Sequence, residues 1–341
     1  MQKFFKSLLL IFLILVIFVL FTTLIIFQKV STYLGKSPDY LINTLSSLDK
    51  NNPYQNKDKI NFIVLGLDKR DDLLEKTNTT DTIIFISLNL KNQKINTISI
   101  PRDLWFYEIN SKVNEIYPLS LTRPNQLDYI KEQFKNLINQ PIDHVVVLTT
   151  DNLIKFVNLI GGVDVTLKNG FIDTQYPNPE YIKNPSSNAL KYKTVEFKSG
   201  LVHLDSSNIT EFVRSRKGSE TISGGGTDLA RIQRQQLLVE AILNKLKTGQ
   251  FVNNNSNPID LYRFWDKEIT KDISDLNILY LFSSIGENIS KLTFNKIELP
   301  IGTNSKNGLI YHPYTFLHNQ WVFIPNDKEY RDFQQFFSDS I

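Results

Sequence analysis

The sequence contains no cysteine among its 341 residues. Disulfide bonds, thiolate metal sites and a cysteine nucleophile are therefore excluded. It also lacks a Gly-x-x-x-x-Gly-Lys-Ser/Thr phosphate loop and a Gly-x-Ser-x-Gly nucleophile elbow. Histidine is scarce as well: the four histidines show no metal-ligand spacing, and His144 lies in an apolar run where a core position is expected.

A strong excess of one charge is also absent. Lys and Arg number 38 against 35 Asp and Glu, which gives a net charge of +3. A balance this even offers no basis for nonspecific nucleic-acid binding, so no nucleic-acid partner is expected. With 41% hydrophobic and 21% charged residues, the chain is typical of a folded protein with a large core.

One long stretch, residues 7–27, has no charged side chain and is mostly Leu, Ile, Val and Phe. As a helix it would reach about 31 Å, enough to cross the hydrocarbon core of a bilayer. Lys3 and Lys6 favour a cytoplasmic N-terminus, residues 1–6, and an external body. A cleaved signal peptide is the alternative, but residues 28–33 offer no small-x-small cleavage site. We predict a single-pass signal anchor in the cell membrane and, without disulfides, a bacterial envelope protein.

The remaining chain divides into a polar stalk, residues 28–58, and one extracytoplasmic domain, residues 59–341. Apolar runs and turn residues predict strands at 60–66, 81–90, 95–100, 144–148, 163–167 and 321–324. Helical periodicity predicts helices at 124–139, 151–159, 206–215, 228–247, 258–266, 273–288 and 327–338. Residues 170–200 are expected to form a long surface excursion. The fold class is therefore α/β (α+β), with a central mixed sheet flanked by helices.

Two arginine pairs, Arg214 with Arg216 and Arg231 with Arg234, flank a loop of three consecutive glycines. Arginine presents a planar fork of donors that matches phosphate oxygens two at a time. On a helix, Arg231, Arg234 and Gln235 would share a face. The pattern favours a phosphate or pyrophosphate site, although arginines on a helix are more often a solvated face.

Acids and one base follow the ends of predicted strands. Asp68 follows the first strand, Asp81 opens the second, and Arg102 and Asp103 follow the third. Side chains just past strand ends commonly line sites in α/β folds. The carboxylates of Asp68, Asp81 and Asp103 would suit Mg²⁺, which takes oxygen ligands. Local turn chemistry is the alternative explanation for aspartates at these places.

Together these residues resemble the LytR-CpsA-Psr (LCP) family of bacterial envelope proteins, over about residues 60–250. The matching segments are Val64-Leu-Gly-Leu-Asp68, Asp81-Thr-Ile, Ser99-Ile-Pro-Arg-Asp103, Lys112-Val-Asn-Glu-Ile-Tyr117, Ile142-Asp-His144, Leu159-Ile-Gly-Gly-Val163, Val213-Arg-Ser-Arg216 and Asp228-Leu-Ala-Arg-Ile-Gln-Arg-Gln-Gln236.

The resemblance implies a Mg²⁺-dependent phosphotransferase that moves a glycopolymer from a polyprenyl-pyrophosphate carrier to peptidoglycan, forming a phosphodiester at the membrane lipid surface. It implies metal-linked acids at Asp68 and Asp81, and catalytic roles for Asp81, Arg102 and Asp103, with Asp103 orienting Arg102 or acting as a base. The residues implied to bind the pyrophosphate are Arg102, Arg214, Arg216, Arg231, Arg234 and Gln235.

One position departs from the family pattern. Members often carry Arg-Ser-Asp before the second strand, whereas this chain has Thr79-Thr80-Asp81. Two other functions stay open, and the substitution motivates the first of them. The domain would hold a pyrophosphoryl lipid without turnover, as a carrier or regulator, or it would be a pyrophosphatase in which water replaces the sugar acceptor.

Overall fold

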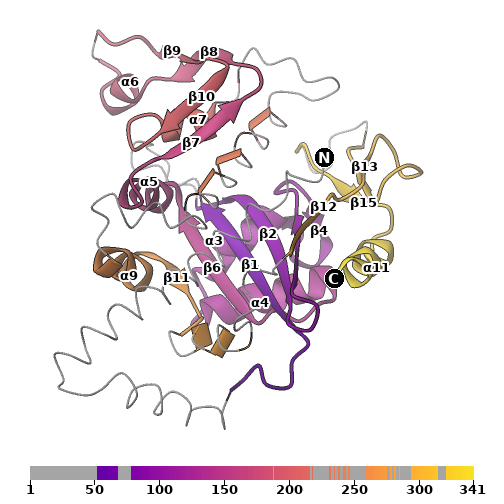
Figure 1. The fold of residues 1–341 in the computed structure, drawn as a ribbon. Helices are drawn as coiled ribbons and strands as arrows, with labels where there is room; N and C mark the ends of the chain where they lie inside the picture. The colour runs from indigo at the N-terminus through magenta and orange to yellow at the C-terminus, as the bar shows by residue number, and fades with distance from the viewer. Residues whose placement is uncertain are drawn as a thin grey trace, which may run out of the picture. The chain divides into compact units, whose positions relative to one another are not determined.

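The computed structural model describes residues 52–67, 78–186, 188–215, 217, 230–231, 234, 237–238, 241–242, 245, 258–274, 277–278, 280–281, 284, 293–313 and 320–341. Figure 1 shows the fold. The described residues form two compact units. We call residues 52–67, 78–149 and 266–341 the sheet unit and residues 150–265 the hairpin unit.

The sheet unit is built on a six-stranded mixed sheet in the order β11-β6-β1-β2-β3-β12 (Figure 1). Its strands are β1 (Lys59–Leu67), β2 (Thr80–Asn89), β3 (Lys94–Ser99), β6 (His144–Thr149), β11 (Thr270–Lys271) and β12 (Thr293–Ile297). β1 pairs antiparallel with β2 and parallel with β6, and β12 pairs parallel with β3. The expected central mixed sheet is therefore confirmed.

One face of this sheet carries the main hydrophobic core. Alternate residues of the central strands, such as Ile63 and Phe85, point into it and are fully buried. Helices α4 (Gln126–Ile138) and α11 (Arg331–Ser340) contribute Phe134 and Phe337 to the same core. Because strand side chains alternate between faces, this apolar set fixes the register of the strands.

The sheet unit also contains several shorter elements. They are β4 (Trp105–Phe106), η2 (Tyr107–Ile109), β5 (Ser111–Lys112), η3 (Val113–Glu115), α3 (Ile116–Ser120), β13 (Ile301–Gly302), β14 (Ile310–Tyr311) and β15 (Ile324–Pro325). β4 pairs antiparallel with β5, which sets Trp105 opposite Lys112. A strand was predicted at 321–324; the structure instead has an isolated bridge between Leu104 and Phe323, followed by β15.

The hairpin unit consists of short strands and helices. They are α5 (Thr150–Leu159), β7 (Val163–Leu167), β8 (Phe171–Pro177), α6 (Pro179–Lys183), β9 (Tyr192–Phe197), β10 (Gly200–Leu204), α7 (Ile209–Arg214) and the first part of α9 (Pro258–Glu268). β8 pairs with β9, and Phe171 stacks on Phe197 with ring centroids 5.1 Å apart. The segment 170–200, expected to be only a surface excursion, therefore contains a strand pair with its own apolar packing.

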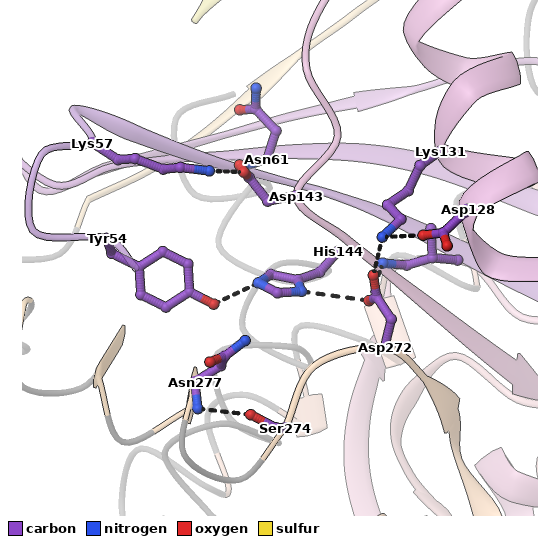
Figure 2. Close-up of polar contacts among 11 residues, drawn as sticks. Tyr54, Lys57, Asn61, Asp128, Lys131, Asp143, His144, Asp272, Ser274 and Asn277 are labelled. Atoms are coloured by element: carbon purple, nitrogen blue, oxygen red, sulfur yellow. Dashed lines mark hydrogen bonds and ion pairs between the residues drawn. The ribbon is translucent and has the colours of Figure 1, made fainter. Parts of the chain in front are cut away.

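A polar network lies in the sheet unit where β6 begins (Figure 2). The Tyr54 hydroxyl is 2.5 Å from Nε2 of His144, and Nδ1 of His144 is 3.4 Å from Oδ1 of Asp272. The other carboxylate oxygen of Asp272 pairs with Lys131 at 2.8 Å, and Lys131 also pairs with Asp128 at 2.8 Å. His144 is buried, as the sequence predicted.

Burial and polar contacts act in opposite directions on the pKa values in this network. Burial alone would raise the pKa of Asp272, but its contacts with His144, with Lys131 and with the Val145 N–H together hold that pKa below its usual value. At Lys131 burial acts to lower the pKa, but the hydrogen bonds to Asp128 and Asp272 outweigh it and raise the pKa. Burial, followed by the nearby Asp143 and Asp272 carboxylates, raises the pKa of Tyr54.

The predicted anchor at 7–27 lies outside the described residues, as does most of the predicted stalk. Among the residues that are described, no helix is both long and apolar enough to span a bilayer.

Candidate functional site

A β-bulge places Asp81 at the end of the central strand pair. Gly66 pairs with Thr82 and Leu67 with Thr80, so Asp81 is the extra residue between two pairs of the ladder. A bulge leaves its extra residue out of the regular pairing and re-aims its side chain. The neighbouring Thr80 is fully buried and its hydroxyl donates to the Asn114 carbonyl at 3.4 Å. Asp81 is therefore set by the irregular backbone rather than by the sheet's alternation.

Arg102 joins Asp81 to Asp103, which the sequence predicted as neighbours at this edge. Its Nη1 forms a short ion pair with Oδ1 of Asp81, and its Nε donates to Oδ2 of Asp103 at 3.2 Å. Lys112 then donates to Oδ1 of Asp103 at 2.7 Å. The four side chains form one chain of alternating charge: Asp81, Arg102, Asp103, Lys112.

The sequence analysis gave Lys112 no role, although it belongs to a quoted segment. Its position depends on the β4–β5 pairing, which sets it opposite Trp105. A lysine well beyond the end of the predicted strand at 95–100 gives no local signal of that pairing. The nearby Glu115 is partly buried, and burial raises its pKa while Lys112 acts in the lowering direction.

Backbone hydrogen bonds fix the segment that carries these charges. The Asn114 N–H donates to the Arg102 carbonyl at 3.2 Å, and the Phe323 N–H donates to the Asp103 carbonyl at 2.8 Å. The side chains themselves stay partly open: Arg102 is 26% exposed and Asp81 is 21% exposed. A half-buried cluster on a fixed backbone keeps its geometry yet admits a ligand from solvent.

The net charge of the four groups is zero, with two carboxylates and two cations. Guanidinium and ammonium groups bind phosphate by the same hydrogen bonds that they make to carboxylates. The carboxylates of Asp81 and Asp103 therefore occupy donors of Arg102 and Lys112 that an anionic ligand would use. The arrangement is able to bind a phosphoryl group and to balance charge that develops on it.

The hairpin unit holds the other predicted residues, around the end of α7. Arg214 is the last residue of this helix and is half-buried. The next residue, Ser215, donates its hydroxyl to Oδ2 of the buried Asp173 at 2.5 Å. The Lys217 N–H donates to the same oxygen at 3.1 Å. Asp173, which the sequence analysis did not select, thus anchors the segment on both sides of position 216.

Arg234 is only 3% exposed, and its guanidinium is committed to protein groups. It donates to the carbonyl oxygens of Phe212, at 3.0 Å, and of Ser215. Its charge also lies over the Phe171 ring, 4.2 Å from the ring centroid. These contacts make Arg234 a support for the Arg214 segment, and pyrophosphate binding by it stays a prediction.

Arg231 is also buried, at 5% exposure, so it does not lie on the solvated helix face that was the alternative explanation. Arg216, Gln235 and Asp68 lie outside the described residues. The roles predicted for these four residues stay predictions.

The donor chemistry at the sheet edge fits Mg²⁺. Asp81 offers carboxylate oxygens, and Mg²⁺ is commonly bound by one or two carboxylates plus substrate phosphates. Asp68 follows the last residue of β1 directly in sequence and would be the second ligand. Within the described part of the chain, no three His, Cys, Asp or Glu side chains gather closely enough to hold a metal ion by themselves.

The central mixed sheet with its flanking helices defines the class of the protein as a mixed α/β fold. Comparison with known families gives the particular one: a model of the LytR_cpsA_psr family matches residues 29–328, so the chain belongs to this family. The resemblance drawn from the sequence segments is confirmed. The match also includes residues 251–328, where no family segment was recognised in the sequence.

Two curated relatives carry the same printed name, polyisoprenyl-teichoic acid–peptidoglycan teichoic acid transferase TagU. The protein from Oceanobacillus iheyensis is 25% identical over 218 residues, which are 62% of this chain and 59% of that relative. The protein from Bacillus subtilis strain 168 is 22% identical over 269 residues, 77% of this chain and 76% of that relative. The match thus spans less than two thirds of the first relative's length.

Solved structures support the fold. The crystal structure of Bacillus subtilis TagV matches with a TM-score of 0.54 at 18% identity and covers 84% of this chain and 98% of that one. The structure of TagT bound to LI-WTA matches with a TM-score of 0.51 at 19% identity, covering 83% and 91%. At these identities the likeness concerns the fold alone.

Proposed function

We propose that the chain is a phosphotransferase that moves a glycopolymer from a polyprenyl-pyrophosphate carrier to peptidoglycan. An acceptor hydroxyl oxygen would attack the phosphorus attached to the glycopolymer, and its proton would pass to the departing lipid phosphate or to solvent. The bond from that phosphorus to the bridging oxygen would break, polyprenyl monophosphate would leave, and a phosphodiester would remain. The names of the TagU relatives and the family match support this reaction.

The alternating Asp81–Arg102–Asp103–Lys112 cluster is the observation that carries the proposal. Phosphoryl transfer needs positioning and compensation of the charge on phosphate oxygens more than it needs a covalent intermediate. Arg102 supplies a donor fork at a strand edge, held from two sides by carboxylates. The same fork would turn to the pyrophosphate when the carrier lipid binds.

The geometry favours one of the two roles considered for Asp103. Its two oxygens accept hydrogen bonds from Arg102 and Lys112, so the carboxylate is enclosed by cations. A carboxylate held in this way orients its partners more readily than it removes a proton. We therefore assign Asp103 as the positioning residue for Arg102. We assign Asp81 as the carboxylate next to the reacting phosphate.

Mg²⁺ would be held by Asp81 together with Asp68. When bound, the ion would draw charge from the phosphate oxygens and so favour departure of the lipid phosphate. In the chain itself, Arg102 binds the pyrophosphate, and Asp103 and Lys112 keep Arg102 in place. The family resemblance assigns pyrophosphate contacts to Arg214, Arg216, Arg231, Arg234 and Gln235 as well, and these roles stay predictions.

Residues 7–27 would keep this domain at the outer surface of the cell membrane, where the carrier lipid is found. Protease added to intact spheroplasts should then digest the bulk of the protein. Full protection would contradict this topology.

The central experiment incubates the purified protein with a radiolabelled lipid-pyrophosphate glycan, Mg²⁺ and peptidoglycan. Label bound to peptidoglycan supports the transferase. Unchanged donor that nevertheless binds the protein supports a lipid-binding or regulatory role, which the threonine at position 79 motivates. Release of phosphorylated glycan into solution without acceptor supports a pyrophosphatase. The Arg102→Ala variant is the control, because it removes the cluster's central donor and should abolish any of these reactions.

A further inference from the structure

One tryptophan of the sheet unit is exposed beside the charged cluster. The chain contains three tryptophans. Trp105 is 3% exposed and Trp265 is 0% exposed, whereas Trp321 is 41% exposed. A single exposed apolar side chain is ordinary on a protein surface and carries no function by itself. Its packing and its connection to the site distinguish Trp321.

Trp321 is held in one orientation by two neighbouring rings. Its ring is stacked on His312, with centroids 4.7 Å apart and planes 26° apart. It meets Phe323 edge-on, with centroids 4.7 Å apart. His312 is itself fixed, because its Nδ1 lies 2.8 Å from the Val322 carbonyl oxygen, an acceptor, and must therefore carry the proton. The exposed indole surface is thus preorganised and loses little freedom when a ligand covers it.

The same segment is bonded to the backbone of the charged cluster. The Phe323 N–H donates to the Asp103 carbonyl, and the Trp105 N–H donates to the Phe323 carbonyl, both at 2.8 Å. Leu104 and Phe323 form a parallel bridge. Trp321 lies two residues before Phe323, and two residues of extended chain span about 7 Å at most. Trp321 is therefore close to the backbone of Asp103.

We propose that Trp321 is a stacking subsite for a sugar ring of the acceptor peptidoglycan strand, an inference that rests on the proposed function. A pyranose ring has an apolar face of C–H groups, which is attracted to the electron-rich face of an aromatic ring. The pyrophosphate of the donor is bound by cations such as Arg102. The acceptor must present its hydroxyl at the same phosphorus, so its next sugars extend over the adjoining surface that carries Trp321.

The first test measures binding without any transfer. Because the other two tryptophans are buried, quenching of intrinsic fluorescence by acrylamide reports mainly on Trp321. Soluble peptidoglycan strands should protect this emission from quenching in the Arg102→Ala protein, which is inactive in transfer. Protection by the lipid-linked donor or by anionic phospholipid vesicles, but not by strands, would overturn the assignment.

The second test uses Trp321→Ala and, as a matched control, Tyr192→Ala, which removes an aromatic ring of 45% exposure from the hairpin unit. Calorimetry should show about two- to tenfold weaker strand binding for Trp321→Ala, the range expected for one aromatic stack. The KM for peptidoglycan should rise by the same factor while kcat and the donor KM stay constant. Strand affinity equal to wild type in Trp321→Ala, with unchanged circular dichroism, would refute the subsite.

If neither variant nor wild type transfers label, the proposed function fails while the binding measurements still decide the subsite. Trp321→Phe is the conservative variant and should restore most of the strand affinity lost in Trp321→Ala. Loss of affinity in Trp321→Phe as large as in Trp321→Ala would also contradict a stacking role.

Discussion

Replacing Asp272 with asparagine should destabilise the sheet unit, because Asp272 is the carboxylate that ties β6 to α4. Asparagine keeps the shape and one acceptor, so the bond from the Val145 N–H at 2.8 Å survives in principle. The change removes the charged partner of Lys131, which is 2.8 Å away, with side chains 25% and 16% exposed. Hydrogen bonds to charged groups contribute about 1.5–3 kcal/mol. Because both side chains are partly exposed, we expect the free energy of unfolding to fall by an amount in the lower half of this range.

The pH dependence of this loss has a defined sign. The folded-state pKa of Asp272 is lowered, so its contribution to the free energy of unfolding is present above the unfolded pKa of about 3.9 and is lost as the pH falls through the folded value. The folded-state pKa of Lys131 is raised, so its contribution is complete below about pH 10.4 and is lost at higher pH. Asp272→Asn should therefore cost most between these limits and little at either extreme.

Urea unfolding of the purified protein across this pH range measures the global effect, and hydrogen exchange at Val145 measures it locally. Asp128→Asn is the matched control. It removes the other carboxylate bound to Lys131, but Asp128 is 70% exposed, so a loss below about 1 kcal/mol is expected. Equal losses in the two variants, or a loss for Asp272→Asn that does not shrink as the pH is lowered from about 3.9, would refute the reasoning.

Further substitutions test the site. Asp81→Ala should abolish Mg²⁺-dependent transfer in single-turnover assays with and without the ion, while donor binding falls less than in Arg102→Ala; normal transfer would disprove the metal assignment. Arg102→Ala should weaken donor binding by about tenfold to a hundredfold, since it removes charged hydrogen bonds. Thr79→Arg should raise the single-turnover rate by adding a donor for developing charge, and an inert or harmful change would mean that another basic residue already fills that space. Lys112→Met should lower kcat by loosening Arg102, and Lys112→Arg should restore part of it; equal rates in both would exclude a positioning role. Asp173→Asn should weaken donor binding and speed hydrogen exchange at Lys217, and unchanged exchange there would argue against anchoring of this segment.

Most of the sheet could be predicted from the sequence because its strands are apolar runs bounded by turn residues. β1, β2, β3 and β6 begin and end within one residue of the predicted limits, and β7 coincides with its predicted range. β12 was missed, because Thr293–Ile297 mixes polar and apolar residues and becomes a strand only by pairing with β3. That pairing joins positions about two hundred residues apart, which no local pattern encodes.

The candidate site was predictable to the extent that it depends on strand ends. Asp81, Arg102 and Asp103 were expected together because each adjoins a predicted strand, and the structure brings them into contact. Lys112 and Asp173 were not expected at the site, because the role of each depends on contacts with another segment of the chain. For Arg234 the sequence pattern indicated a ligand-binding helix face, but the side chain is buried. It lies over the Phe171 ring and donates to the Phe212 carbonyl within the protein.

The bulge at Asp81 connects the fold to the proposed chemistry. At the bulge, the Thr80 hydroxyl donates to the Asn114 carbonyl and the extra residue, Asp81, reaches Arg102. Arg102 in turn is bound by carboxylates on two sides, which keeps its guanidinium in place before substrate arrives. A pyrophosphate that displaces Asp81 from Arg102 would leave the Asp81 carboxylate beside the new anion, where two negative groups are tolerated only if a cation lies between them. The cluster therefore gives a physical reason why carrier binding and Mg²⁺ binding should each strengthen the other.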